Sequence, residues 1–518
     1  MRRGPAGLLS VSTARWQRRA RILLVVVPFL WLGARPQRAA ASEPPGTAAA
    51  YARLDEYVAA QLESARIPGA ALVVVEGDRI AHLAAFGSSG PSGERVTPQT
   101  PFCVGSVSKS FTALAVLQLL EQGLLELDAS VQRYLPWFEV AGRGAAARIT
   151  LRQLLTHTSG LSTWSGRRAE ADELPLAHAL RELARFELDA APGDRFEYSN
   201  ANYQVLGAVI EAIAGASYPD YIERRVFEPL GLRHAYARGS AALADHLATG
   251  HRYWFGWPVA EERTPNPGAA LPSGGLMLSA EDLGRYLLAW LGGGAIGSSR
   301  LLSPAAVELA LQPQVRVPSG GQYALGWNVK PSGETFGVWH TGRTSSFHTH
   351  VAIDRASRRG FALLLNAESY VSGPAIGKLG VEVGRALSGQ EPVAISGPGI
   401  PPGLAALMVF VALQALLCAR GVVALSRSRR AAVVPVASTL RYLFAPLALA
   451  AGLSVSALVL VPRSNDVDWL GLARAAPDAG GLLLAVAVQA VLWAMLRAAA
   501  WLQQSNSANL FPFRKRAG

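Results

Sequence analysis

The strongest constraint on the fold of this chain is the hydropathy of its last quarter. Three long apolar stretches follow a linker rich in proline and glycine. Each stretch approaches the length of about 20 residues that a helix needs to cross a bilayer. The sequence therefore predicts three transmembrane helices within residues 404–502, with the globular part upstream of the linker at residues 398–403. The stretches are residues 404–419, 442–461 and 480–496.

The charges between these stretches predict how the helices are oriented. Five arginines lie between the first and second stretches, whereas the next connection carries nearly balanced charge. Because loops rich in arginine stay in the cytoplasm, we expect the first connection and the basic tail at residues 503–518 on that side. The globular region is then expected on the opposite side. The alternative, in which one stretch is a buried core helix, is opposed by this charge pattern.

Residues 1–41 have the pattern of a secretory signal. They hold eight arginines and no acidic residue, an apolar run from Ile22 to Ala34, and three alanines before Ser42. These features are typical of a signal peptide, and an uncleaved signal anchor is the alternative. Either one exports residues 42–397. We therefore expect a multi-pass protein of the bacterial cytoplasmic (inner) membrane, with a domain facing the periplasmic or extracytoplasmic side.

The formal net charge of +12 comes from these two ends of the chain. Residues 42–397 lack the basic surface that nucleic-acid binding needs, so no nucleic-acid partner is expected. The two cysteines, Cys103 and Cys418, fall in different regions and are not expected to pair. The exported domain must then be stabilised by its hydrophobic core, for which it is long enough.

A serine and a lysine three residues apart are the first chemical signal. In Ser106-Val107-Ser108-Lys109 the two side chains share one face of a predicted helix. The chain uses arginine almost everywhere and has four lysines, and only lysine can give up its proton to act as a base. The turn-like approach to Ser106 puts it at a helix N-terminus, where an anion is stabilised. The alternative is that Ser106 is only a helix cap.

The order of the predicted elements defines the fold class. Residues 69–76 and 79–87 form a predicted hairpin, and helical patterns dominate from residue 106 to about 214. Strands return near the end of the region. We expect an α/β (α+β) domain with one antiparallel sheet built from both ends, flanked by helices, and an inserted helical lobe. The late strands are residues 323–330, 336–340, 349–354 and 361–366, before a helix at residues 376–387.

Two further motifs accompany the serine and lysine. Tyr198-Ser199-Asn200 follows a Pro-Gly turn in the helical lobe, and His340-Thr341-Gly342 lies on a late strand. In this order, Ser-x-x-Lys, Tyr-x-Asn and His-Thr-Gly resemble the serine β-lactamase and penicillin-binding protein superfamily, specifically its class C β-lactamase-related peptidase and esterase branch. The resemblance spans roughly Leu54 to Leu387 and implies the β-lactamase/transpeptidase-like fold. It includes residues 154–161, 272–276 and 323–327.

The resemblance implies a role for each matching residue. Ser106 would attack a carbonyl and form an acyl-enzyme, with Lys109 easing its deprotonation. Tyr198 would carry the proton between nucleophile and leaving group, and Asn200 would bond the substrate amide and Lys109. The backbone N–H groups of Ser106 and Arg343 would hold the oxyanion. Water would release the acyl group, so no metal or organic cofactor is expected.

One departure from the family pattern bears on the substrate. The β-lactamases usually carry lysine where His340 precedes Thr341 and Gly342 on the substrate-binding strand, and histidine is mostly neutral at pH 7. We therefore expect weaker recognition of a substrate carboxylate, with the side chain of Arg343 as one candidate for replacing part of the charge. Such a histidine is familiar in the peptidase and esterase members.

The sequence thus predicts an exported, membrane-anchored serine hydrolase acting on amide or ester bonds. D-amino-acid-containing peptides, as in cell wall, and small esters are the expected substrates, through D,D-peptidase, D-aminopeptidase or esterase activity. The alternatives are a weak β-lactamase and a non-turnover penicillin or cell-wall sensor. The oligomeric state is not predicted.

Other conspicuous residues are given structural roles. His157, in a Thr-His-Thr-Ser-Gly turn, is expected to make hydrogen bonds that hold the turn. Cys103 is expected to be a packing residue rather than a second nucleophile. His348 and His350 share one face of a strand but make an incomplete metal site, so no metal is expected.

Overall fold

The computed structural model describes residues 46–169, 175–261, 268–318, 320–330, 336–369, 373–395, 399–427, 445–463 and 469–509. The expected signal segment, residues 1–41, lies outside these ranges. So does the arginine-rich connection at residues 428–444.

An eight-stranded sheet forms the centre of the globular region, in the order β10-β11-β12-β13-β14-β15-β1-β2. Its paired strands are antiparallel, and β1 from the start of the region pairs with β15 from its end. The predicted antiparallel sheet built from both ends is confirmed. The strands are β1 Gly69–Glu76, β2 Arg79–Gly87, β10 Val315–Arg316, β11 Gln322–Tyr323, β12 Asn328–Val329, β13 Val338–Arg343, β14 His348–Asp354 and β15 Arg359–Leu365.

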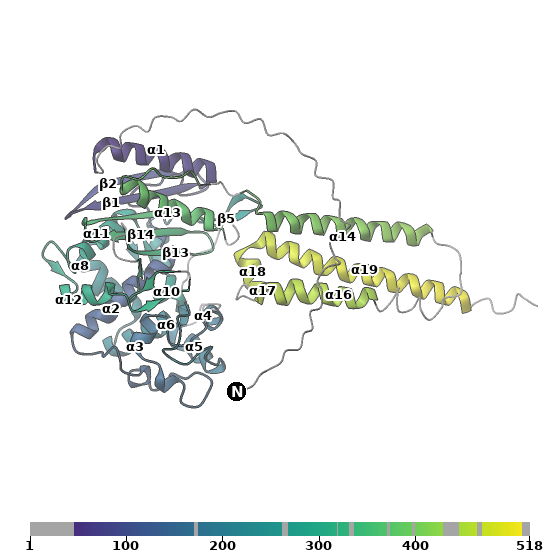
Figure 1. The fold of residues 1–518 in the computed structure, drawn as a ribbon, viewed down its shortest axis with the longest axis horizontal. Coiled ribbons are helices and arrows are strands. Elements are labelled where there is room, and N and C mark those ends of the chain that lie inside the picture. Colours follow the sequence, from purple (N-terminus) through teal and green to yellow (C-terminus); the bar gives the residue numbers. More distant parts are fainter. Residues whose placement is uncertain are drawn as a thin grey trace, which may run out of the picture. The chain divides into compact units, whose positions relative to one another are not determined.

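Both faces of β1 are buried, because helices cover the sheet on each side. Alternate side chains of a strand point to opposite faces. Leu72 and Val74 accordingly pack in a core with α1 (Ala48–Ala65) and α13 (Gly373–Leu387). Val73 and its alternate neighbours pack in a second core, which includes α11 (Ala280–Leu291). Figure 1 shows α1 and α13 beside β1 and β2.

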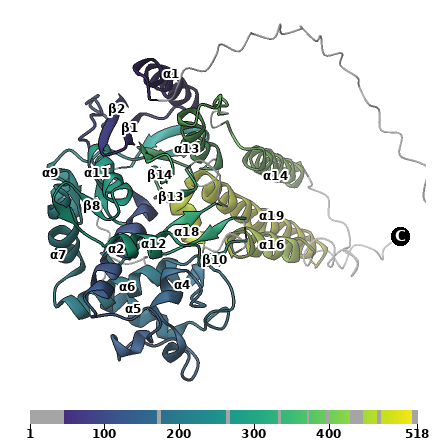
Figure 2. The same cartoon turned by 60° about the vertical axis from the view of Figure 1, so that its left-hand side comes forward.

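A helical lobe lies across β13 from α1 and α13, as both ribbon views show (Figures 1 and 2). Its central helix is α2 (Ser108–Glu121), whose residues from Ser108 to Leu119 are all buried. A helix that is covered on every side explains why its apolar residues do not form a single stripe. The other helices are α3 Leu151–Leu155, α4 Thr163–Ala169, α5 Leu176–Arg181, α6 Asn200–Ala214, α7 Tyr218–Ile222, α8 Glu228–Leu230, α9 Gly239–Ala244, α10 Leu271–Gly274 and α12 Pro304–Leu311.

Three small sheets complete the globular region. One of them, β16-β5-β6, pairs β5 with both of its neighbours and leaves β6 at an edge. The short strands are β3 Phe102–Cys103, β4 Ala235–Tyr236, β5 His251–Trp254, β6 Trp257–Ala260, β7 Met277–Leu278, β8 Ala295–Ile296, β9 Ser299–Arg300 and β16 Ala367–Glu368.

The predicted strand at residues 323–330 is wrong, because this segment turns back on itself. It contributes to two short strands, β11 and β12, which pair with each other. Gly326 lies between them with φ +82°. A Cβ atom at Gly326 would come within 2.9 Å of Ala113 and 3.1 Å of the carbonyl oxygen of Lys109. The turn therefore needs glycine both for its backbone conformation and for close packing against α2.

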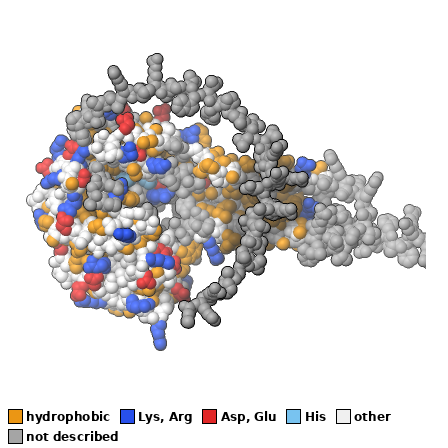
Figure 3. Space-filling model, in the orientation of Figure 1, with side chains coloured by type: hydrophobic (Ala, Val, Ile, Leu, Met, Phe, Trp, Pro, Cys, Tyr) orange, Lys and Arg blue, Asp and Glu red, His pale blue; other side chains and the backbone are white. Residues whose placement is uncertain are grey.

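In the part of the chain that the structure describes, three helices after residue 401 are long and apolar enough to cross a membrane. The candidate spans are Pro402–Val423, Ala445–Arg463 and Pro477–Ala499, with mean hydropathies of 2.1, 2.0 and 2.1. They agree closely with the predicted stretches, and the first includes Arg420. Figure 3 shows hydrophobic side chains gathered along these helices. The helices are α14 Pro402–Arg427, α16 Ala445–Val455 with its continuation through α17 Val461–Arg463, α18 Trp469–Ala475 and α19 Pro477–Asn509.

Candidate active site

Ser106 lies in a single 3₁₀ turn, Gly105–Val107, that leads directly into α2. Gly105 has φ +53°, and a Cβ atom there would come within 2.5 Å of the backbone nitrogen of Arg343. The glycine thus allows the turn to approach β13. The turn is fastened from the other side by Ser108, whose hydroxyl donates to the carbonyl of Gly105 at 2.7 Å. Ser106 is therefore held at the N-terminal end of α2, as the sequence predicted.

Lys109 is fully buried, one turn further along the helix. Its Nζ donates to Ser106 Oγ at 3.0 Å, to Asn200 Oδ1 at 2.7 Å and to the carbonyl oxygen of Ser273 at 2.6 Å. A buried ammonium is costly unless such partners replace its hydration. The first two contacts were expected from the sequence. The third was not, because a backbone acceptor leaves no signal in residue type.

Tyr198 lies beside the lysine, with Lys109 Nζ 4.8 Å from the centre of its ring. The backbone that carries Tyr198 is held by a hydrogen bond to its carbonyl and by the helix that follows. Thr163 Oγ1 donates to the carbonyl of Tyr198 at 2.7 Å, and α6 begins two residues later at Asn200. The structure thus brings together Ser106 and Lys109 from one segment and Tyr198 and Asn200 from another. An ammonium in this place stabilises negative charge on the serine or the phenol.

His157 holds the segment around Tyr198 in place through hydrogen bonds. Its Nδ1 accepts from the backbone N–H of Ser199 at 3.2 Å and from Asn202 Nδ2 at 3.0 Å, and its carbonyl accepts from the N–H of Glu197. Complete burial, with the charge of Lys109 nearby, holds the pKa of His157 well below its ordinary value. The imidazole is therefore neutral and makes the structural hydrogen bonds that the sequence predicted for this turn.

The strand β13 packs against the nucleophile turn through its glycine. A Cβ atom at Gly342 would lie 1.8 Å from the carbonyl oxygen of Val104 and 3.2 Å from the backbone nitrogen of Ser106. Together with the approach of Gly105 to Arg343, this contact shows that the backbone at Ser106 and the backbone at Arg343 pack closely against each other. Two fixed backbone donors are what an oxyanion site requires.

His340 lies on the same strand and is neutral. Its Nδ1 donates to the carbonyl of Thr341 at 2.7 Å, which leaves Nε2 to accept from Tyr323 Oη at 3.2 Å. Burial and the charge of Lys109 lower the pKa of His340 to about 3. At neutral pH this position therefore carries no positive charge. Tyr323 was not assigned this contact from the sequence.

The side chain of Arg343 is engaged away from the nucleophile. Its Nε and Nη2 donate to the two oxygens of Glu368 at 3.1 and 3.2 Å. His348 Nδ1 donates to the same carboxylate at 2.6 Å. Burial raises the pKa of Glu368, but His348 and Arg343 together hold it below its ordinary value. The guanidinium charge is thus already balanced, which opposes the idea that Arg343 replaces the missing lysine.

Two other residues discussed from the sequence have surroundings that favour packing. Burial raises the pKa of the Cys103 thiol to about 12, so the reactive thiolate is disfavoured. His350 lies between the rings of Trp339 and Phe361, with ring centres 5.9 and 5.5 Å away. His348 and His350 therefore have different partners rather than a common ligand.

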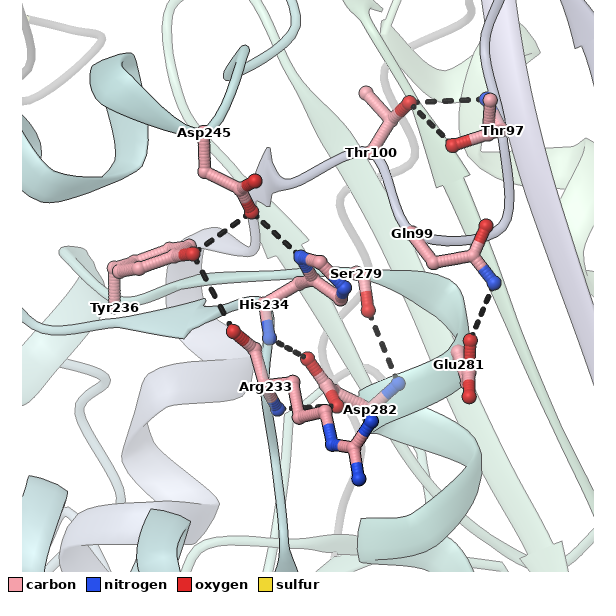
Figure 4. Close-up of polar contacts among 10 residues, drawn as sticks. All are labelled: Thr97, Gln99, Thr100, Arg233, His234, Tyr236, Asp245, Ser279, Glu281 and Asp282. Atoms are coloured by element: carbon pink, nitrogen blue, oxygen red, sulfur yellow. Dashed lines mark hydrogen bonds and ion pairs between the residues drawn. The ribbon is translucent and has the colours of Figure 1, made fainter.

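A separate cavity of about 520 Å³ lies near β4 and α11, and its lining includes Thr97, His234 and Asp245. Figure 4 shows polar contacts among residues in and next to this lining. His234 Nδ1 donates to Asp245 at 2.6 Å, and Asp282 accepts from the backbone N–H groups of Arg233 and His234. These bonds tie the segment before β4 to the start of α11. The cluster is accounted for by fold stability, and we assign no chemistry to it.

A family model described as Beta-lactamase matches residues 54–382. This match covers more than half of the chain, and the fold and the Ser106–Lys109 pair agree with it. The chain belongs to the serine β-lactamase and penicillin-binding protein superfamily, as its motifs predicted.

Among curated proteins, the chain is similar to Protein flp of Staphylococcus aureus strain COL, with 26% identity over 327 residues, 61% of this chain and 63% of that protein. It is also similar to Penicillin-binding protein 4 of Amycolatopsis lactamdurans, with 34% identity over 253 residues, 48% of this chain and 65% of that protein. The chain thus spans less than two thirds of the length of these relatives.

Two solved structures share the fold. The octameric penicillin-binding protein homologue from Pyrococcus abyssi has a TM-score of 0.58 and 25% identity, over 67% of this chain and 79% of its own. The D-alanine carboxypeptidase AmpC from Burkholderia cenocepacia has a TM-score of 0.55 and 24% identity, over 66% of this chain and 99% of its own. The predicted fold class is confirmed.

Proposed function

We propose that this protein is a membrane-anchored serine hydrolase that acts through an acyl-enzyme on Ser106. The observation that carries the proposal is the buried Lys109 ammonium, which lies 3.0 Å from Ser106 Oγ while Asn200 and a backbone carbonyl hold it in place. A lysine in this position lowers the cost of forming a serine alkoxide. The family to which the chain belongs supports the same chemistry.

The reaction follows from the arrangement of the groups. Ser106 Oγ attacks the substrate carbonyl and gives its proton to the phenolate of Tyr198, which the Lys109 ammonium stabilises, and the new oxyanion accepts from the backbone N–H groups of Ser106 and Arg343. Tyr198 then passes the proton to the leaving amine or alcohol. Asn200 is placed to bond both Lys109 and a substrate amide. Water attacks the acyl group in the second half-reaction, with the same residues accepting its proton.

The neutral His340 supports an amide or ester substrate that needs no cation at this position. Its pKa of about 3 and the pairing of Arg343 with Glu368 leave the strand β13 without a free positive charge from either side chain. An efficient β-lactamase of this type benefits from a cation that meets the substrate carboxylate. We therefore place small esters and D-amino-acid-containing peptides ahead of β-lactams.

Export and anchoring are part of the same proposal. The three apolar helices from Pro402 onward have the length and hydropathy of membrane spans, and the arginines between the first two favour a cytoplasmic location for that connection. The hydrolase domain, residues 42–397, would then face the extracytoplasmic side. Cell-wall peptides are accessible to an enzyme in that position.

The test is a turnover screen of the full chain in detergent micelles. Short acyl esters, D-Ala-D-Ala peptides and a cephalosporin are supplied to the wild type, to Ser106→Ala and to Ser357→Ala, whose serine lies in the β14–β15 turn. We expect repeated turnover of an ester or a D-peptide by the wild type and Ser357→Ala, and none by Ser106→Ala. A single stoichiometric acylation without turnover would instead indicate a sensor, and activity in Ser106→Ala would contradict the mechanism.

A further inference from the structure

The hairpin formed by β5 and β6 exposes large apolar side chains at the edge of a sheet. Trp254 is 48% exposed, Trp257 is 61% exposed and Val259 is 47% exposed. Edge strands that face water are usually protected by charged residues, because an exposed apolar edge promotes aggregation. The edge strand β6 carries Trp257 and Val259 instead, and Trp254 lies opposite Trp257 at the end of β5. The composition of this edge therefore favours contact with an apolar environment rather than with water.

The turn at the tip of the hairpin also keeps an aromatic residue at a conformational cost. Phe255 and Gly256 have φ values of +49° and +81°. Two-residue turns with both φ values positive strongly favour asparagine at the first position and glycine at the second. Here phenylalanine occupies the first position, where a bulky side chain is disfavoured. The tip thus carries three aromatic residues, of which Trp254 and Trp257 are exposed and Phe255 is half-buried.

A cation lies against this aromatic tip. The guanidinium carbon of Arg66 is 4.1 Å from the centre of the Trp257 ring, and Arg66 Nη1 donates to the carbonyl of Gly256 at 3.0 Å. Tryptophan is enriched at membrane–water interfaces, where its ring is apolar and its N–H is hydrated. Arginine at the same depth directs its charge toward lipid headgroups. The combination of residues is typical of an interfacial anchor.

The tip also contacts the polar end of a membrane-length helix. The backbone N–H of Phe255 donates to Asp478 Oδ2 at 3.0 Å, and the other oxygen of Asp478 accepts from the N–H of Ala479. Asp478 is the second residue of α19, whose candidate span is Pro477–Ala499. The end of a span marks the depth at which hydrocarbon gives way to headgroups. The aromatic tip is therefore at the depth where tryptophan is favoured.

We propose that Trp254, Phe255 and Trp257 insert into the headgroup–acyl boundary of the bilayer that the chain's own helices cross. This inference rests on the membrane anchoring proposed above. The insertion adds a second attachment of the hydrolase domain to the membrane, besides the peptide link before α14. It fixes the height of the domain above the lipid surface.

The experiment uses the full chain in nanodiscs of phosphatidylcholine that contain a small fraction of a diazirine-labelled phosphatidylcholine. After illumination and trypsin digestion, cross-linked lipid is located by mass spectrometry. We expect cross-links in the peptide that begins at Tyr253, at a yield at least ten times that of the peptides containing Leu124 or Leu243. Those two leucines are exposed apolar residues elsewhere on the domain, at 48% and 44%. Cross-links within Pro402–Val423 serve as the positive control.

A variant separates insertion by the tryptophans from accidental proximity. In Trp254→Ser/Trp257→Ser the yield at the hairpin should fall at least fivefold, while in Leu124→Ser/Leu243→Ser it should not change. Spans labelled without the hairpin would overturn the proposal, and so would equal yields at the hairpin and the two leucines. Unlabelled spans would overturn it together with the anchoring. Failure of the hydrolase proposal is recognised separately, by loss of Ser106 reactivity with an unchanged cross-link pattern.

Discussion

The site around Ser106 buries polar side chains, whereas the helices after residue 401 expose apolar ones. In the site, Lys109 and His340 are buried, and each has hydrogen-bond partners. In α14, Leu417 is 63% exposed and Val409 is 60% exposed. The first arrangement is stable in a domain surrounded by water because the hydrogen-bond partners of the buried lysine and histidine replace their hydration. The second suits a hydrocarbon solvent, in which exposed leucine costs nothing. The difference is what we expect of a chain with its globular region in water and its last helices in hydrocarbon.

Removing the buried ammonium should have the largest effect on activity. Lys109→Met keeps the length of the side chain but loses the donor to Ser106 and Asn200, so we expect hydrolysis to slow roughly 10²- to 10⁴-fold. Lys378→Met, on an exposed position of α13, is the matched control and should keep wild-type activity. Steady-state rates with the best ester substrate measure both. Equal rates for the two variants would contradict the role of Lys109.

A methyl group added to β13 should lower the activity, whereas one added to α14 should not. In Gly342→Ala the new Cβ would meet the carbonyl of Val104 at 1.8 Å, so β13 must move away from the nucleophile turn. Loss of one oxyanion donor costs about 10²- to 10³-fold in turnover. Gly421→Ala in α14 has no atom within 4 Å of its new methyl group and should be silent. An active Gly342→Ala variant would show that the Arg343 N–H is dispensable.

Truncation of a leucine in each region tests the comparison through stability. Leu72→Ala removes a fully buried side chain from the core under α1 and should lower the free energy of unfolding by about 2–5 kcal/mol. Leu417→Ala removes an exposed side chain and should change it by less than about 0.5 kcal/mol. Chemical denaturation of the full chain in micelles gives both values. A large loss for Leu417→Ala would mean that this face of α14 is packed against protein.

Stability should also depend on pH. The pKa of His340 is about 3 in the folded protein and near 6.5 in the unfolded chain. The unfolded chain therefore takes up a proton that the folded protein refuses, and stability falls as pH drops from 6.5 toward 3. The decline should be smaller in His340→Gln. An NMR titration that placed the His340 pKa near 6.5 would contradict a neutral, buried imidazole.

Much of the fold and part of the site could be predicted from the sequence. The three-residue spacing of Ser106 and Lys109, the hairpin at residues 69–87 and the apolar stretches each have a local signature, because helical and strand periodicity is written in neighbouring residues. The carbonyl of Ser273 and the pairing of Arg343 with Glu368 have none, because they depend on segments that only the fold brings together. The turn at Gly326 was missed because a glycine in a strand pattern does not reveal a reversal.

The most direct test of the central claim is the mass of the full chain after exposure to a fluorophosphonate probe, followed by peptide mapping. We predict one adduct, located on Ser106 and absent from Ser106→Ala, because the buried Lys109 donates to the side-chain oxygen of this serine at 3.0 Å. An adduct on another serine, or none on folded protein, would contradict the account of Ser106 as an activated nucleophile.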